Sequence, residues 1–143
     1  MQRHRSFWGW GWQEELPSQE ERDRLTGLLG GFFADHPPRP APYPELETVS
    51  LPKPAVKIPA EFASFCDDSR FERAAHTYGK NYRDLVRGFE GDFTAAPDFV
   101  AFPREEDDIV RLLQWARDLD VAVVPYGGGT SVVGGVECGR DEA

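Results

Sequence analysis

The sequence is poor in cysteine, and it contains no long apolar run. Its two cysteines, Cys66 and Cys138, form neither a CxxC pair nor a cluster with histidine, so we expect no metal site. Two thiols cannot build a disulfide framework, which favours a reducing compartment. No stretch approaches the roughly 20 apolar residues that cross a bilayer, and the N-terminus lacks the apolar region of a signal peptide. We therefore expect a soluble, cytoplasmic protein without a transmembrane segment.

Positive charge is also scarce. The 143 residues include 16 basic and 25 acidic side chains, which gives a net charge of -9. This balance argues against non-specific binding to nucleic acid or to an anionic membrane surface, and it leaves a small molecule as the expected partner. The exception is a basic stretch that consists of Arg73, His76, Lys80, Arg83 and Arg87. It could face an anionic ligand, but composition favours a solvated face on which Arg83 and Arg87 pair with Asp84.

Residues 1–59 predict an N-terminal arm, a short helix and a proline-rich connector. Three tryptophans alternate with glycine over residues 8–12, a pattern that suits neither a helix nor an ordinary strand. They could form an aromatic platform for a ligand or peptide. An arm that packs its indoles onto the body of the protein is the simpler interpretation, because buried aromatic side chains mostly serve packing.

A short helix is predicted after this arm, because Ser18 and Glu21 have the spacing of a capping box. The apolar positions of this helix, and the glycines expected to weaken and end it, are Leu25, Leu28, Leu29, Gly27, Gly30 and Gly31. Eight of the twelve prolines then fall within residues 37–59, too densely for a helix or a central strand. We expect an extended connector there, in preference to a ligand for a proline-recognising domain.

Residues 60–96 form a predicted helical region, with one or two short helices between residues 60 and 88. The remainder, residues 97–143, predicts a strand at 98–102, a helix that starts in the acidic residues 105–108, and a second strand from Val121. The apolar face of this helix is expected to contain Ile109, Leu112, Leu113 and Ala116. Strand, helix and strand over about thirty residues indicate a βαβ unit with two parallel neighbouring strands.

The second strand leads into a glycine-rich loop formed by Pro125, Tyr126, Gly127, Gly128, Gly129, Thr130 and Ser131. Residues without a Cβ let successive N–H groups approach one anion, and two hydroxyl groups add donors. A Walker loop is excluded because no lysine follows the glycines and the next basic residue is Arg140. A Rossmann fingerprint is excluded because Val132 occupies its last glycine position. The residues alone leave a phosphate cradle and a ligand-free glycine linker equally open.

Several segments together resemble a known family of flavoenzymes. They are the sequences at residues 97–103, 108–110 and 115–116, the VVPYGGGTSV segment at 123–132, the tryptophan-glycine arm, and the RAAHTYGKNYRDL segment at 73–85. This series resembles the start of the FAD-binding domain of the vanillyl-alcohol oxidase and p-cresol methylhydroxylase (PCMH) superfamily. Within that superfamily it is most similar to the alkylglycerone-phosphate synthases, also called alkyldihydroxyacetonephosphate synthases.

The resemblance implies an α+β fold with a PCMH-type FAD-binding domain, preceded by a helical and proline-rich N-terminal region. It implies that residues 125–131 wrap the FAD pyrophosphate, with Gly134 and Val136 continuing near the cofactor. The family's reaction replaces the acyl chain of an acyl-dihydroxyacetone phosphate by a fatty alcohol in ether lipid synthesis, without net redox. The flavin serves as an electron sink in such chemistry.

Because the expected sheet should continue beyond its second strand and relatives are several times longer, we expect this chain to be an N-terminal fragment that is inactive alone. Its catalytic residues are then unknown and expected beyond residue 143. Open strand edges and apolar faces would favour association, and a homodimer is one expected form. Two other functions stay open: an FAD-dependent dehydrogenase or oxidase of 2-hydroxy acids such as lactate or glycolate, and a non-enzymatic interaction module that uses the tryptophans and prolines.

Overall fold

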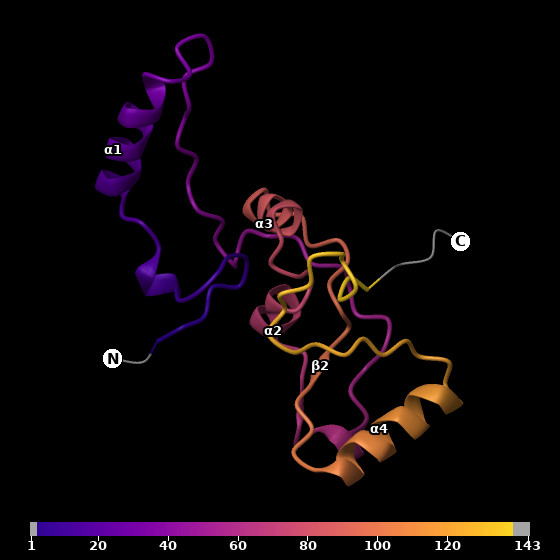
Figure 1. The fold of residues 1–143 in the computed structure, drawn as a ribbon. Coiled ribbons are helices and arrows are strands. Elements are labelled where there is room, and N and C mark those ends of the chain that lie inside the picture. The colour runs from indigo at the N-terminus through magenta and orange to yellow at the C-terminus, as the bar shows by residue number, and fades with distance from the viewer. Residues whose placement is uncertain (1–2, 139–143) are drawn as a thin grey trace. The chain divides into compact units, whose positions relative to one another are not determined.

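The computed structural model describes residues 3–138, and the chain divides into two compact units. Unit 1 consists of Met1–Ser6 and Trp10–Tyr43, and unit 2 consists of Phe7–Gly9 and Pro44–Ala143. Figure 1 traces both along the chain. Arg140 and the predicted domain end at residue 143 lie outside the described residues.

Unit 1 contains a 3-10 turn at Gln13–Glu15 and the helix α1 at Gln19–Gly30. The predicted capping box is present: the Glu21 amide donates to Ser18 Oγ at 3.2 Å, and the Ser18 amide donates to Glu21 Oε2 at 2.8 Å. These two bonds satisfy amides that the first turn of a helix leaves without partners. The helix ends at the predicted glycines, with Gly31 as its C-cap.

The proline-rich connector has no helix or named strand between residues 37 and 59, which confirms the predicted extended conformation. Its first part is held in unit 1 by Arg22, whose guanidinium lies 4.3 Å from the Tyr43 ring centroid and donates to the Ala41 carbonyl at 2.7 Å. Its later part belongs to unit 2, where Arg70, the first residue of the helix α2 at Arg70–Ala75, donates to the carbonyls of Leu46 and Val49. Arginine side chains therefore hold both parts of this proline-rich segment.

The packing interpretation of the tryptophan arm holds for one of its tryptophans. Trp8 belongs to unit 2 and meets Phe89 edge-on, with ring centroids 5.3 Å apart, while the preceding Phe7 is buried. Trp12, in unit 1, lies under the guanidinium groups of Arg3 and Arg5. Trp10 is 54% exposed, so the arm as a whole does not lie on a surface through its indoles.

Unit 2 is an α+β structure, as expected. Its elements in chain order are a 3-10 turn at Ala60–Phe62, β1 at Cys66–Asp67, α2 at Arg70–Ala75, α3 at Tyr82–Phe89, β2 at Val100–Ala101 and α4 at Glu106–Asp118. The two short helices predicted before residue 88 are α2 and α3, and α3 runs one residue past Gly88. Their N-caps are the side chains of Ser69 and Asn81, which accept from the amides of Glu72 and Asp84.

Two apolar clusters form the core of unit 2. One contains Phe7, Val49, Ala74 and Phe93, and brings together the arm, the connector, α2 and the segment after α3. The other contains Phe62, Phe65 and Leu112, with Trp115 meeting Phe62 edge-on at 5.7 Å. The second cluster places α4 against the 3-10 turn and the small sheet.

The expected apolar face of α4 was only half right. Leu112 and Ala116 are buried, at 9% and 2% exposure, but Ile109 and Leu113 are 45% and 49% exposed. The inner face also contains Asp108, whose carboxylate accepts from the Arg104 amide at 3.1 Å. The buried stripe therefore consists of Asp108, Leu112 and Ala116, and it excludes Ile109 and Leu113.

The predicted parallel strand pair was wrong for the described residues. β2 pairs with β1, antiparallel, with Cys66 opposite Ala101 and Asp67 opposite Val100. Residues 121–125 are extended but have no strand partner within residues 3–138. A β-branched run becomes a strand only when a neighbouring strand completes its hydrogen bonds, and no strand within the described residues does so for residues 121–125.

None of the helices in the described part of the chain is long and apolar enough to cross a membrane.

Candidate functional site

The glycine loop lies beside α2 and α3, where the segment after α4 returns along unit 2, drawn in yellow in Figure 1. Tyr126 anchors its first part. The Tyr126 hydroxyl is 3.0 Å from the carbonyl oxygen of Tyr78 and 3.3 Å from that of Ala75, at the C-terminal end of α2. Its ring meets His76 edge-on, 4.6 Å between centroids. Burial, and then the nearby Asp84 charge, raises the pKa of Tyr126, so this hydroxyl keeps its proton and remains a donor.

Gly129 is the glycine that the loop conformation itself requires. Its φ is +68°, in the left-handed region that residues with a Cβ rarely adopt. A Cβ at this position would also collide with the Tyr126 hydroxyl and lie 2.7 Å from its Cζ atom. The Tyr126 ring thus occupies the space where a side chain of Gly129 would lie, and the loop closes onto its own second residue.

The loop is anchored a second time at residues 79–84. The Asn81 amide nitrogen is 3.3 Å from each of the carbonyl oxygens of Ser131 and Val132. Gly79 lies so close that a Cβ there would be 2.8 Å from the Ser131 oxygen and 3.3 Å from the Gly129 oxygen. Real Cβ atoms do not approach an oxygen at 2.8 Å, so residue 79 must be glycine for the loop to lie here.

Residues 131–137 form a further turn after the glycines. The Gly135 amide donates to Ser131 Oγ at 2.9 Å, and the Glu137 amide donates to the Gly134 carbonyl at 3.0 Å. The Glu137 carboxylate pairs with Arg87 of α3 at 3.0 Å. The loop is therefore held at both of its ends by unit 2.

Between these anchors Gly127, Gly128 and Thr130 are exposed, whereas Gly129 is buried. A Cβ at Gly127 would meet nothing within 4 Å, and one at Gly128 would meet only Thr130 Cγ2, at 3.7 Å. Within residues 3–138, no internal acceptor is found for the amides of residues 127–130. The exposed amides of residues 127, 128 and 130 are free to bond to water or to an external acceptor such as a phosphate oxygen. Thr130 is exposed and the Ser131 hydroxyl hydrogen is not needed by Gly135, so both hydroxyls can add donors.

The basic stretch of the sequence is mostly used for internal contacts. Arg73 is buried and donates to two backbone carbonyls. His76 Nδ1 donates to the Glu72 carbonyl at 2.8 Å and lies 3.3 Å from its carboxylate. Arg87 binds Asp92 and Glu137 and lies 3.9 Å from the Tyr78 ring centroid.

The ion pair predicted around Asp84 was wrong. Asp84 is 4% exposed and accepts from Asn81 Nδ2 at 2.8 Å, whereas Arg87 turns to Asp92 and Glu137. Arg83 is exposed. Residues 83, 84 and 87 do lie on successive turns, but Asp84 faces inward, because its amide is the one capped by Asn81.

Sequence patterns did not indicate Gly79 and Asn81 as parts of this site. A signal for one of them exists: Asn81 stands three residues before Asp84 at the start of an amphipathic helix, which is N-cap spacing. Nothing in that spacing shows that the same side chain also reaches residues 131 and 132, fifty positions later. No cluster of metal-ligating side chains was found in the described part of the chain.

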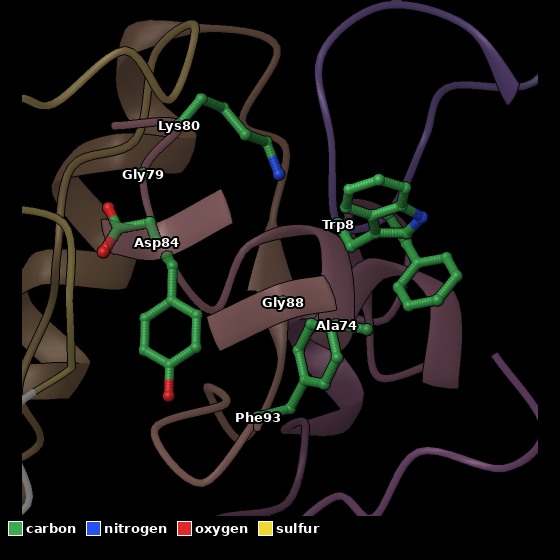
Figure 2. Close-up of a pocket in the computed structure, with 9 residues that line it drawn as sticks. Trp8, Ala74, Gly79, Lys80, Asp84, Gly88 and Phe93 are labelled. Carbon is green, nitrogen blue, oxygen red and sulfur yellow. The ribbon is translucent and has the colours of Figure 1, made fainter. Parts of the chain in front are cut away.

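Lys80 lies beside this anchor, in the small pocket that Figure 2 shows with Gly79, Asp84 and Gly88. The pocket leaves about 0 Å³ of free space for a water-sized molecule, far below the roughly 300 Å³ at which ligand pockets begin. Burial lowers the pKa of Lys80 from 10.5 to about 8, although the Asp84 charge opposes this shift. The pocket is therefore a place where a charged amine is destabilised, and it is too small for a substrate.

We expect the stability difference between the wild type and Lys80→Met to depend on pH. Below about pH 8 both folded and unfolded states carry the Lys80 proton, and burial of the charge destabilises the wild type. Between about pH 8 and 10.5 the folded state releases the proton first, so the wild type gains stability relative to the variant as pH rises. Urea unfolding of both proteins should show a relative gain of about 3 kcal/mol across this range. A stability difference between the two proteins that does not change with pH would contradict this prediction.

Comparison with known proteins identifies the loop's domain. Residues 97–142 match the FAD binding domain family, and this segment contains β2, α4 and the whole glycine loop. This part of the chain is therefore part of an FAD binding domain, and FAD is the cofactor of that domain.

Over a longer stretch, the chain is a relative of the alkyldihydroxyacetonephosphate synthases, which confirms the predicted resemblance. The Trypanosoma brucei brucei synthase is 39% identical over an alignment of 128 positions that covers 81% of this chain and 20% of the relative. The Dictyostelium discoideum synthase is 39% identical over 70 residues, 49% of this chain and 12% of the relative. A solved alkyldihydroxyacetonephosphate synthase structure is 26% identical with a TM-score of 0.74, covering 96% of this chain and 29% of that one. The chain thus spans about a fifth of the length of the Trypanosoma brucei brucei synthase.

Proposed function

We propose that this chain forms the cofactor-loop portion of an FAD-dependent enzyme that exchanges the acyl group of an acyl-dihydroxyacetone phosphate for an alkyl group. The observation that carries the proposal is the 39% identity to the Trypanosoma brucei brucei alkyldihydroxyacetonephosphate synthase over 128 aligned positions. This similarity extends well upstream of the FAD binding domain. Similarity confined to the domain would support only the cofactor. Because the chain spans 20% of that relative, the activity is proposed for the whole protein.

The residues that would hold the FAD pyrophosphate are Pro125, Tyr126, Gly127, Gly128, Gly129, Thr130, Ser131 and Gly134. The exposed amides of residues 127, 128 and 130 and the hydroxyls of Thr130 and Ser131 would donate to the phosphate oxygens. Tyr126 would contribute its backbone, since its side chain is turned toward α2. When bound, FAD supplies an electron sink for the exchange, while the protein orients the reactants.

Product analysis tests the proposed reaction. The flavin-loaded protein is incubated with an acyl-dihydroxyacetone phosphate and a labelled fatty alcohol, with an artificial electron acceptor present. We expect a labelled ether and released fatty acid in equal amounts, with no reduction of the acceptor, because the exchange involves no net redox. Reduction of the acceptor without ether formation would contradict the proposal.

A second candidate is an FAD-dependent dehydrogenase of 2-hydroxy acids. The mitochondrial D-lactate dehydrogenase [cytochrome] of Arabidopsis thaliana is 45% identical over 38 residues, which are 27% of this chain and 7% of that protein. This similarity is higher but much shorter, so it fits a shared cofactor better than a shared substrate. Lactate-dependent reduction of the acceptor in the same assay would favour this candidate.

A non-enzymatic interaction module stays a third hypothesis, and it would predict that the protein binds no flavin. The cytoplasmic location and the homodimer also stay predictions. Fractionation of cells and sedimentation of the purified protein would check these two.

A further inference from the structure

We propose that Asn81 is a positioning residue of the FAD loop, which it holds by the carbonyl groups so that the loop's amides are left for the cofactor. The inference rests on the proposed function for its ligand. It places part of the cofactor site upstream of residues 97–142, the segment that matches the FAD binding domain.

The Asn81 side chain uses both of its polar atoms. Its Oδ1 accepts the Asp84 amide at 3.0 Å, which caps α3. Only the oxygen can accept that amide, so the orientation of the side chain is determined and the nitrogen must face the loop. The nitrogen lies 2.8 Å from Asp84 Oδ2 and 3.3 Å from both the Ser131 and the Val132 carbonyl oxygens. Two hydrogens are thus shared among three acceptors.

The surroundings of Asn81 hold it in place. Asp84 is 4% exposed, so its carboxylate needs a donor inside the protein, and Asn81 supplies one. Gly79 brings the backbone of this segment against the loop, since its missing Cβ would lie 2.8 Å from the Ser131 oxygen and 2.9 Å from Asp84 Oδ2. The side-chain amide of Asn81 therefore caps α3, binds the buried Asp84 carboxylate and contacts the loop at the same time.

The direction of the contacts matters for an anion. Three loop carbonyls, those of Gly129, Ser131 and Val132, face residues 79 and 81. A carbonyl oxygen carries partial negative charge and would repel a phosphate, whereas an amide attracts it. By holding these carbonyls on the protein side, Asn81 and Gly79 remove the repulsive groups from the part of the loop that is open. This is why a donor, and not an acceptor, is needed at position 81.

Two substitutions separate this function from helix capping. Asn81→Asp and Asn81→Ser both keep a strong N-cap residue, but neither keeps the amide donor. Ser69→Ala is the matched control, because it removes the N-cap of α2 without touching the loop. Asn81→Asp also places a carboxylate beside Asp84, so Asn81→Ser guards against a variant that fails to fold.

The first readout is hydrogen exchange in flavin-free protein at the amides of Gly135 and Glu137, which donate within the turn that follows Ser131 and Val132. The second is the FAD dissociation constant, from flavin fluorescence. We expect about tenfold faster exchange and about tenfold weaker FAD binding for both Asn81 variants, the effect of losing one to two hydrogen bonds. Ser69→Ala should change neither.

The outcomes distinguish the two proposals. Wild-type exchange and wild-type affinity in both Asn81 variants would overturn the positioning function while leaving the FAD function intact. If the wild type binds no FAD, the proposed function fails. Exchange at the Gly135 and Glu137 amides in flavin-free protein then still decides whether Asn81 holds the loop. Equal acceleration in Ser69→Ala would show a merely structural effect and would also overturn the inference.

Discussion

Replacing Gly128 by valine is expected to abolish FAD binding and to leave the fold unchanged. The protein has room for the new side chain, since a Cβ at this position meets only Thr130 Cγ2, at the ordinary contact distance of 3.7 Å. The φ of Gly128 is also outside the left-handed region, so valine brings no backbone strain there. A phosphate held by the amides of residues 127–130 would, by contrast, need the space that the valine occupies. We expect the FAD dissociation constant to rise by about 100-fold or more, roughly 3 kcal/mol.

The measurement is the flavin content of purified protein, together with titration of flavin-free protein with FAD. Gly27→Val in α1 is the control, because a Cβ there also meets nothing within 4 Å and lies in unit 1. Thermal unfolding of the flavin-free variants should give midpoints close to the wild type. Wild-type flavin content in Gly128→Val would show that the pyrophosphate does not lie at this loop.

The second large effect is expected from Arg73→Met. Arg73 on α2 is 6% exposed, and its guanidinium donates to the carbonyls of Pro97 and Pro52, each at 2.7 Å. Arg73 thereby joins the proline-rich connector, at Pro52, to the first residue of the segment that matches the FAD binding domain, Pro97. Methionine fills a similar volume but leaves two half-buried carbonyls without these donors, at about 1–3 kcal/mol each. We expect the free energy of unfolding to fall by about 3 kcal/mol.

Urea unfolding followed by tryptophan fluorescence measures this loss. Arg83→Met is the matched control, since Arg83 is exposed on α3, and a surface substitution should change stability by no more than about 0.5 kcal/mol. Arg73→Lys should fall between the two, because an ammonium group keeps the charge but cannot span both carbonyls as the guanidinium fork does. Equal stability of Arg73→Met and Arg83→Met would show that the two carbonyls find other donors.

Local patterns predicted the helices well, because caps and helix ends depend on a few neighbouring residues. The capping box at Ser18 and Glu21 and the acidic first turn of α4 are such cases. Strand pairing depends on distant residues, so the apolar run that begins at Val121 could not show that β2 would pair with Cys66–Asp67. The orientation of α4 failed for a related reason, because a polar residue, Asp108, took an inner position that a hydrophobicity pattern assigns to apolar side chains.

The site shows the same division. Three consecutive glycines after an extended apolar run predicted a loop whose backbone an anion could approach, and the exposed amides of residues 127, 128 and 130 fit that prediction. The anchors were not predictable from spacing. Gly79 and Asn81 lie about fifty residues before their loop partners, and a helix cap and a loop anchor require the same residue type. Long-range contacts of this kind appear only when the chain is folded.

The double anchoring of the glycine loop has a consequence for the affinity of ligand binding. Tyr126 is tied to the end of α2, and Ser131 and Val132 are tied to Asn81, so only the four residues 127–130 span the gap between fixed ends. Ordering a free backbone takes about 1–2 kcal/mol per residue, and a flexible glycine loop would demand this of its ligand at each binding event. Here most of that ordering takes place as the chain folds. The cofactor would therefore meet a pre-organised surface, and more of its interaction energy would appear as affinity.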